Sequence, residues 1–345
     1  MLLKTNPRKL IPTLFLISLF ALSAASCGSK AEQAVQETEA VPIVEQPTAT
    51  PLPPDRAVLI ISPDDNAETA TQAQNLLAEL ATSSGLEFET RQDISAETLT
   101  ADIKVLVFLH HPDNLGTLAA GASGTQFVAI SDLDWTPPAN VTLIHEDTTG
   151  TAFLAGYIAA ITAPNFRVGA LLASEDAQMN TAFKNGVSYY CGICSAVITP
   201  LNAYPVIAEQ TAASTPEIWQ AVFDQINQSK VNVVYIAREA VSPQLLSYLS
   251  SQDVAIISNQ QVTEEGRSRW AASVYMDAIT PLREIWGDLV AGIGGRTISA
   301  TFQVGDIQEI TLTDGSVWLS PGKLILVNQM VDLMREGQIN TQSAN

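Results

Sequence analysis

Short apolar runs alternate with amphipathic segments along most of the chain. Residues 57–61, 105–109 and 168–172 are continuously apolar and rich in β-branched side chains, which is typical of parallel strands covered on both faces. Between such runs apolar residues recur at helical spacing, as in residues 67–80. The alternation predicts an α/β fold. Further strands are expected at residues 127–130, 141–144, 197–198, 231–236 and 254–257, and further helices at residues 151–161, 177–190, 215–227 and 243–250.

The series of strands and helices runs through twice and then changes character. The second series starts after residue 147, and two series of this length exceed the core of one ordinary domain. We therefore expect two lobes, each a mostly parallel sheet flanked by helices. The C-terminal part predicts a helix, two strands, a hairpin turn at Asp314-Gly315 and a closing helix. The corresponding helices and strands are expected over residues 277–291, 297–304, 308–312 and 323–334.

The first residues have the pattern of a bacterial lipoprotein signal. Three cationic residues, the last of them Lys9, precede an uncharged stretch over residues 11–25, which is too short to cross a bilayer as a helix. Small residues come directly before Cys27. We expect residues 1–26 to be removed and a lipid on Cys27 to hold the protein at a membrane, facing the extracytoplasmic side. A secretory signal with an incidental cysteine and a single transmembrane anchor are the alternatives.

Residues 27–54 and the overall charge limit the kinds of partner. This segment mixes prolines with acidic and small polar residues, so we expect a disordered tether that begins at the lipidated Cys27. The net charge of the chain is −19, and such a surface repels phosphate backbones and anionic lipid headgroups. We expect no nucleic-acid partner, and membrane contact through the lipid anchor alone.

Two cysteines remain after the expected lipidation, Cys191 and Cys194. Outside the cytoplasm such a pair is usually oxidised, so we expect a small structural disulfide. A redox-active pair and a zinc site are the alternatives. A zinc site needs two further ligands, and all three histidines lie far from the pair in the sequence. No metal and no cofactor are expected.

Motifs in the middle of the chain resemble a known family. Residues 150–160 read Gly-Thr-Ala-Phe-Leu-Ala-Gly-Tyr-Ile-Ala-Ala, residues 167–169 read Arg-Val-Gly, and residues 183–187 read Phe-Lys-Asn-Gly-Val. These segments resemble helix and strand motifs of the basic membrane lipoprotein family. That family belongs to the type I periplasmic binding proteins, and its studied members bind purine nucleosides for ABC transporters. The resemblance covers about residues 57–336 and is specific from residue 147 to residue 190.

The resemblance implies a two-lobed type I periplasmic-binding-protein fold. The chain would cross between the lobes near Asp147, near Tyr275 and at residues 304–306. A small-molecule solute would bind between the lobes, at the carboxyl ends of the strands, and an ABC permease would be the protein partner. Lobe one would hold residues 55–147 and 277–303, lobe two residues 148–276 and 304–336, and residues 337–345 would form a frayed tail.

The sequence departs from the family where the ligand is bound. Residues 62–66 read Ser-Pro-Asp-Asp-Asn and lack the aromatic residue that would stack on a base. Ser258 stands where the resemblance places a ribose-binding Asp, and Tyr275 stands where it places a Lys. Asp132 keeps the acidic residue that the family has after its fourth strand. We therefore expect the binding role to carry over better than the nucleoside.

Side chains that directly follow the predicted strands are the candidate ligand contacts, because the carboxyl ends of parallel strands meet at one edge of a sheet. Each has a structural alternative. An Asp before a helix is often its N-cap, a His after a buried strand is usually a hydrogen-bonded structural residue, and a Trp is either a stacking platform or a rim residue. The candidates are Asp64, Asp65, His110, Asp132 and Trp135 in lobe one and Arg238, Asn259, Gln260 and Tyr275 in lobe two, with His111, Ser174, Glu175 and Glu239 beside them.

The sequence favours a binding protein over an enzyme. It contains no Gly-x-Ser-x-Gly elbow, no His-Glu-x-x-His motif and no phosphate-binding loop. Asp132 and Asp134 are a candidate pair of catalytic carboxylates, as in glycosidases, but alternate residues of a strand face opposite ways. A ligand sensor that feeds a membrane signalling protein has the same fold, and the sequence leaves that alternative open.

Overall fold

The structure is a computed structural model that describes residues 53–63, 65–192, 194, 199 and 204–342. The described part belongs to one compact unit, Leu52–Asn345. The predicted signal peptide, Cys27, most of the tether, Asp64 and the strand expected at residues 197–198 lie outside the described residues, so these predictions stay predictions. Within the described ranges, no helix is both long enough and apolar enough to span a bilayer.

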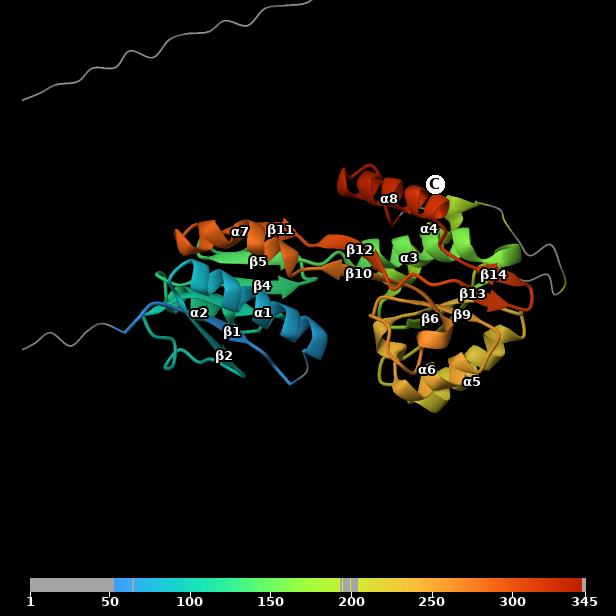
Figure 1. Cartoon of the computed structure of the whole chain (residues 1–345), viewed down its shortest axis with the longest axis horizontal. Helices are drawn as coiled ribbons and strands as arrows, with labels where there is room; N and C mark the ends of the chain where they lie inside the picture. The colour runs from blue at the N-terminus through green and yellow to red at the C-terminus, as the bar shows by residue number, and fades with distance from the viewer. Residues whose placement is uncertain (1–52, 64, 193, 195–198, 200–203, 343–345) are drawn as a thin grey trace, which may run out of the picture. The chain divides into compact units, whose positions relative to one another are not determined.

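Two six-stranded sheets organise this unit, and we name the parts built on them lobe one and lobe two (Figure 1). The lobe-one sheet has the order β11-β5-β4-β3-β1-β2 and is parallel throughout. Its inner strands are almost completely buried, as expected when helices cover both faces. The strands are β1 (Arg56–Ile60), β2 (Glu87–Arg91), β3 (Ile103–Phe108), β4 (Gln126–Ser131), β5 (Val141–His145) and β11 (Arg296–Ser299).

The lobe-two sheet has the order β12-β10-β9-β8-β6-β7, and only β12 runs antiparallel to its neighbour. A separate hairpin follows it in the chain and turns at Thr313-Asp314, one residue before the predicted turn at Asp314-Gly315, because Gly315 already pairs with Leu312. The strands are β6 (Val168–Ala173), β7 (Val206–Gln210), β8 (Val233–Ile236), β9 (Ala255–Ser258), β10 (Trp270–Asp277), β12 (Thr301–Gly305), β13 (Ile310–Leu312) and β14 (Gly315–Val317).

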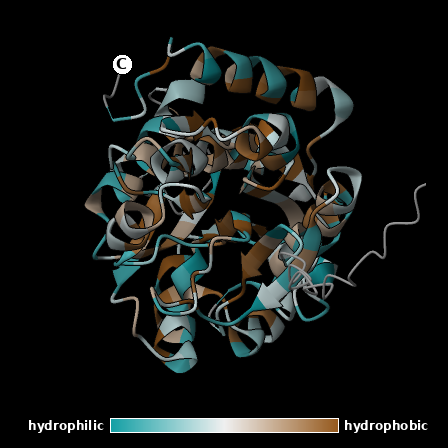
Figure 2. Ribbon diagram, turned by 90° about the vertical axis from the view of Figure 1, so that its left-hand side faces the viewer, coloured by the Kyte–Doolittle hydropathy of each residue, from teal (hydrophilic) through white to brown (hydrophobic). Residues whose placement is uncertain are grey.

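Helices cover both faces of each sheet, which confirms the predicted α/β fold with two lobes. Figure 2 shows brown, hydrophobic strands inside and teal segments on many outer turns. In lobe one, α1 (Ala67–Ser83) and α7 (Thr280–Val290) share one core and α2 (Leu115–Gly121) the other. In lobe two, one core contains α3 (Thr148–Thr162), α4 (Ala177–Tyr190) and α8 (Pro321–Arg335), and the other contains α5 (Pro216–Asn227) and α6 (Pro243–Ser250).

Two of the three motifs that carry the family resemblance, residues 150–160 and 183–187, form the contact between α3 and α4. Every residue of α3 from Gly150 to Thr162 is buried, as expected of a helix that is apolar on all sides. A Cβ atom at Gly156 would collide with the backbone carbonyl of Phe183 on α4, and one at Gly186 would collide with that of Phe153 on α3. The two glycines therefore let the helix backbones approach each other directly.

Three segments connect the lobes. The first lies between β5 and α3, the second between β10 and α7, and in the third only Ala300 separates β11 from β12. Figure 1 shows α7 and β11, in orange, beside the green strands β4 and β5 of lobe one. The sequence placed the third crossing at residues 304–306, whereas β12 pairs with β10 from Thr301 onward. Apolar and polar residues alternate without interruption over residues 297–304. The sequence pattern therefore gives no sign that one strand ends and another begins at Ala300.

The sequence pattern missed two of the four edge strands, β2 and β7. Residues 87–91 read Glu-Phe-Glu-Thr-Arg, and no position of either strand is fully buried. Neighbouring strands and helices cover only part of an edge strand, so its sequence lacks the continuous apolar run that marks the inner strands. The expected disulfide is present and joins Cys191 to Cys194 at the C-terminal end of α4.

Candidate functional site

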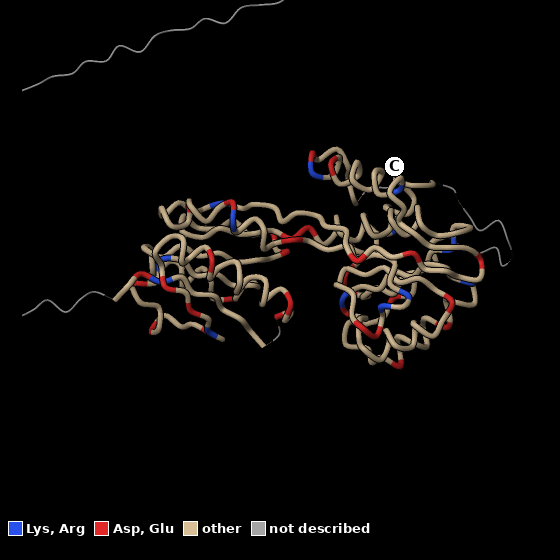
Figure 3. The backbone as a smooth tube through the Cα atoms, viewed as in Figure 1, with Lys and Arg blue, Asp and Glu red and all other residues tan. Residues whose placement is uncertain are grey.

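Most of the predicted site residues that the structure describes lie in loops at the carboxyl edges of the two sheets, and Tyr275 lies within β10. In lobe one these loops follow β1, β3, β4 and β5, and in lobe two they follow β6, β8 and β9. Figure 3 shows acidic residues gathered along the segments that connect the lobes, with few basic residues among them. The hydrogen-bond partners of these carboxylates distinguish those with a structural role from those available to a ligand.

Three of the carboxylates bind backbone N–H groups at helix starts, and two of them, Asp147 and Asp176, are N-caps. Asp147 accepts a hydrogen bond from the backbone N–H of Gly150 at 2.7 Å at the start of α3. Asp176 accepts one at 2.8 Å at the start of α4, and Asp277 accepts two at 2.9 Å at the start of α7. Each therefore satisfies backbone donors that have no partner inside the helix and interacts favourably with the helix dipole.

Asp65 and His110, both predicted ligand contacts, bind each other. Oδ1 of Asp65 lies 3.1 Å from Nδ1 of His110, and its Oδ2 accepts a hydrogen bond at 2.6 Å from the backbone N–H of Ser62. The Asp65 side chain is 8% exposed, whereas that of His110 is 44% exposed. Asp65 therefore holds the loop after β1 in place. The N-cap of α1 is Asn66.

The ring of His111 packs against the indole of Trp135. The ring centroids of Trp135 and His111 are 4.9 Å apart at an interplanar angle of 81°, which is a favourable edge-to-face geometry. Trp135 also packs against the core beneath α2. Nε2 of His111 is buried and has no hydrogen-bond partner among the described residues. Part of the indole surface that could stack on a ligand is therefore already covered.

Charged groups from both lobes meet at the first connecting segment. Asp132 follows β4 and Glu146 follows β5 in lobe one, while Arg238 follows β8 in lobe two. Burial raises the pKa of the partly buried Glu146 carboxyl; the charge of Arg238 lowers this pKa and that of Asp132 raises it further. None of the three side chains forms a hydrogen bond or an ion pair with another residue that the structure describes.

The loop after β9 contributes amide groups. Oδ1 of Asn259 is buried and lacks a hydrogen-bond partner in the described part of the chain. The backbone N–H of Gln260 donates to Oγ of Ser258 at 3.2 Å, and its side-chain amide donates to the carbonyl of Asn259 at 3.5 Å. Gln260 is therefore engaged within its own loop, whereas Asn259 offers an acceptor to a ligand.

Gln261 links the two lobes beside Tyr275. Burial raises the pKa of the Tyr275 phenol, and a hydrogen bond with Gln261 opposes that increase. With its amide turned so that the nitrogen faces α1, Gln261 also donates to the carboxylate of Glu68 in lobe one, at 2.9 Å to Oε1. Gln261 was not among the predicted site residues, and only its position after β9, one residue beyond Gln260, could have suggested it.

Two other candidates are engaged inside lobe two. Glu175 accepts hydrogen bonds from the backbone N–H of Ala212 at 3.1 and 3.2 Å, and from the hydroxyl of Ser174 at 3.2 Å. These bonds join the loop after β6 to the loop after β7.

The described residues contain no group of three or more His, Cys, Asp or Glu side chains that could hold a metal ion.

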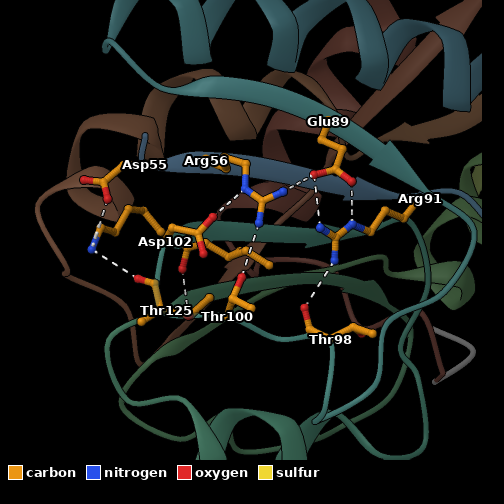
Figure 4. Close-up of polar contacts among 11 residues, drawn as sticks. Asp55, Arg56, Glu89, Arg91, Thr98, Thr100, Asp102 and Thr125 are labelled. Atoms are coloured by element: carbon orange, nitrogen blue, oxygen red, sulfur yellow. Dashed lines mark hydrogen bonds and ion pairs between the residues drawn. The ribbon is translucent and has the colours of Figure 1, made fainter. Parts of the chain in front are cut away.

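A separate hollow of about 470 Å³ lies against the edge strand β2. Arg56 contacts Asp102 and Glu89 at 2.6 Å each, and Arg91 contacts Glu89 at 2.7 Å (Figure 4). The segment between β2 and β3 contains no helix. The ion pairs of Arg56 and Arg91 lie at this edge of the sheet instead of a helix. Since both guanidinium groups are already paired, we assign the hollow a structural role. Its lining residues are Arg56, Glu89, Arg91, Asp93, Thr98 and Thr100.

No protein-family model and no curated protein matches the chain, but solved structures do. An ABC transporter solute-binding protein from Conexibacter woesei is 15% identical with a TM-score of 0.58, over 83% of this chain and 98% of that one. A solute-binding protein from Aeropyrum pernix is 16% identical with a TM-score of 0.55, over 84% and 93%. A transcriptional activator of the comK gene from Bacillus halodurans is 11% identical with a TM-score of 0.62, over 82% and 99%.

These likenesses show the fold. It is the two-lobed α/β fold of type I periplasmic binding proteins, so the predicted fold class is confirmed. Solute-binding proteins and transcription regulators both have this fold. The narrower resemblance to the basic membrane lipoprotein family is not confirmed. At these identities the neighbours carry no ligand over to this chain.

Glu146 is the main site residue that the sequence interpretation missed. The rule that selects Asp132, a polar residue directly after a buried strand, also selects Glu146, which comes directly after β5. Its neighbour Asp147 marks the crossing between the lobes and caps α3. The sequence interpretation places the crossing near Asp147 and assigns Glu146 no role.

Proposed function

We propose that this protein is the solute-binding component of an ABC importer and that it closes around a small polar solute between its lobes. The observation that carries the proposal is the meeting of Asp132 and Glu146 from lobe one with Arg238 from lobe two. Arg238 and Asp132 both act electrostatically on Glu146, yet none of the three has a bonded side-chain partner among the described residues. Asp132 and Arg238 are exposed, whereas Glu146 is partly buried. A charged group that loses water without gaining a partner costs free energy, and a bound solute would remove that cost for Glu146.

Hinge closure explains how one solute can change the shape of the whole unit. Only a solute that contacts both lobes favours the closed arrangement over the open one. The connecting segments are short, and such segments absorb the backbone rotation of a hinge. Arg238 and Asn259 would bind the solute from lobe two, opposite Asp132 and Glu146. A permease would then distinguish the closed protein from the open one.

A signalling protein could read the same closure, so a ligand sensor is the second candidate. The likeness to a transcription activator does not favour gene regulation for this chain, because a net charge of −19 opposes binding to DNA. Genes for a permease and an ATPase beside this gene would support import. A gene for a membrane kinase in that place would support sensing.

Anchoring by Cys27 completes the proposal and is tested separately. The small residues before Cys27 and the proline-rich acidic segment after it support a lipidated cysteine followed by a tether. Cys27→Ser should move the protein from the membrane fraction to the soluble fraction and leave its thermal unfolding unchanged. Retention of the mutant at the membrane, to the same extent as the wild type, would contradict the lipid anchor.

Binding is tested by thermal-shift screening of nucleosides, sugars and amino acids, followed by calorimetry. A solute at a hundredfold excess over its Kd should stabilise the protein by about 2.7 kcal/mol. Asp132→Ala should weaken binding by about 1.5–3 kcal/mol, because it removes a charged hydrogen-bond partner. Asp134→Asn, an exposed carboxylate two residues along, is the matched control and should bind as the wild type does. Equal affinities for Asp132→Ala and the wild type would exclude this site.

A further inference from the structure

We propose that Tyr275, Gln261 and Glu68 form a latch that keeps the two lobes from opening fully before a solute binds. Glu68 belongs to lobe one, whereas Gln261 and Tyr275 belong to lobe two. The inference rests on the proposed function, because that function requires the lobes to move, and it names the side chains that limit the movement.

The contact crosses from α1 of lobe one to the loop after β9 of lobe two. Figure 1 shows the start of α1, in blue, on the side of lobe one that faces lobe two. The side-chain nitrogen of Gln261 donates to both carboxylate oxygens of Glu68, at 2.9 Å to Oε1. Apart from the connecting segments, no other side-chain hydrogen bond or ion pair joins the lobes among the residues that the structure describes.

The chemistry of the three side chains fixes the direction of their hydrogen bonds. An ionised carboxylate accepts and does not donate, so Glu68 requires the nitrogen of the Gln261 amide. The amide oxygen then accepts from the phenol of Tyr275, which forms a hydrogen bond with Gln261. A hydrogen bond to an ionised acceptor is stronger than one between neutral groups. Gln261 therefore binds both lobes at the same time.

Glu68 has a firm base in lobe one. It lies in the first turn of α1, where the side chain of Asn66 accepts hydrogen bonds at 3.0 Å from the backbone N–H groups of Glu68 and Thr69. The same helix buries Ala73 and Leu77 in the core of lobe one. A force on the Glu68 side chain therefore acts on the whole lobe.

Gln261 has a firm base in lobe two, although it lies in a loop. Oδ2 of Asp306 accepts a hydrogen bond at 3.2 Å from the backbone N–H of Val262 and one at 2.6 Å from the hydroxyl of Ser273. Oγ of Ser273 accepts one at 2.9 Å from the indole N–H of Trp270, and both of these residues are fully buried. The loop that carries Gln261 is thus bonded to the core of lobe two.

The latch holds the lobes in an arrangement that a solute can close further. Asp132, Glu146 and Arg238 have no bonded side-chain partner among the described residues, so a solute that binds them can draw the lobes closer. The latch removes the most open arrangements in advance. The apparent affinity for a solute rises with the fraction of molecules that are ready to bind it, so the latch strengthens binding without a contact of its own to the solute.

Exchanging the amide and the carboxylate tests the latch on the ligand-free Cys27→Ser chain by small-angle X-ray scattering. Gln261→Glu keeps the shape of the side chain but places a second carboxylate against Glu68, so we expect a larger radius of gyration. The double variant Glu68→Gln with Gln261→Glu restores a donor opposite an acceptor and should return the radius to the parent value. Gln225→Glu adds the same charge on the exposed face of α5 and should leave the radius unchanged.

Cross-linking gives a second measurement that needs no solute. In the same chain, Glu68→Cys with Gln261→Cys should form a disulfide under mild oxidation, detected by peptide mapping in a mass spectrometer. The control pair is Glu68→Cys with Gln228→Cys. Gln228 is exposed and follows α5, at the amino edge of the lobe-two sheet, so this pair should not cross-link.

The possible results separate the latch from the proposed function. An unchanged radius for Gln261→Glu, a double variant that stays expanded, or the absence of a disulfide in the Glu68→Cys and Gln261→Cys pair would each overturn the latch. All of these results come from the protein without a solute, so the proposed function would stand. That function fails if the screen of nucleosides, sugars and amino acids produces no thermal shift.

Discussion

Gly186→Ala tests the direct backbone contact between α3 and α4 that supports the core of lobe two. A Cβ atom at this position would lie 2.7 Å from the carbonyl carbon of Phe153 and closer still to its oxygen. Real Cβ contacts essentially never fall below 3.0 Å. The obstructing atoms belong to the backbone of a helix that is buried on all sides, so they cannot rotate away as a flexible side chain could.

Two opposing terms set the size of the effect. Alanine in place of glycine stabilises a helix interior by about 0.5–1 kcal/mol. Overpacking of a close-packed core costs about 1–3 kcal/mol, and here the upper part of that range applies because α3 has to shift. We therefore expect Gly186→Ala to lower the free energy of unfolding by about 1–2 kcal/mol. For a chain of this size that corresponds to a Tm lower by roughly 2–8 °C.

The assay is urea and thermal unfolding followed by circular dichroism. Gly287→Ala is the matched control, because Gly287 lies on the exposed face of α7 and a Cβ there would meet nothing within 4 Å. That variant should be stabilised by about 0.5–1 kcal/mol. A Gly186→Ala protein as stable as the wild type, or two alanine variants that shift in the same direction, would refute the argument from close helix approach.

Three further predictions concern charges and the disulfide. Hydrogen bonds from Thr100 and Arg56 lower the pKa of Asp102 to about 2 from 3.8, so its stabilisation is present above pH 4 and is lost as the pH falls toward 2. Asp102→Asn should therefore cost about 1–2 kcal/mol at pH 7 and almost nothing at pH 2, measured by urea unfolding. Because burial raises the pKa of Glu146, the native state loses stability as the pH rises through that pKa, and Glu146→Gln should raise the ligand-free Tm at pH 7 but not at acidic pH. Cys191→Ser should cost about 2 kcal/mol or less, since the disulfide closes a short loop, and should leave solute affinity unchanged in calorimetry.

The inner strands and most helices could be predicted because burial on both faces leaves an unambiguous pattern. Residues 243–250 were predicted as a helix and form α6 with the same bounds. Pro216 stands at the first position of α5, where a missing N–H has no cost. The sequence pattern did not predict the edge strand β2 because charged side chains interrupt its apolar residues. Glu89 of this strand binds Arg56 and Arg91.

The candidate site could be predicted only to the level of which loops contribute. Order along the chain identifies the residues that follow each strand, but it does not reveal which of them bind each other. Asp65 and His110 are 45 positions apart and form a pair, and Trp135 contacts His111. Such pairings depend on the tertiary arrangement of the loops, so the unpaired state of Asp132, Glu146 and Arg238 becomes apparent only in the folded chain.

Small-angle X-ray scattering tests the central claim, that one solute is bound by both lobes and closes them, most directly. The measurement uses the Cys27→Ser chain with and without the probe that gives the largest thermal shift. The account predicts a smaller radius of gyration with the probe, and no such change for Glu146→Gln at the same probe concentration. A probe that calorimetry shows to be bound, but that leaves the radius of gyration unchanged, would contradict closure of the lobes around a solute.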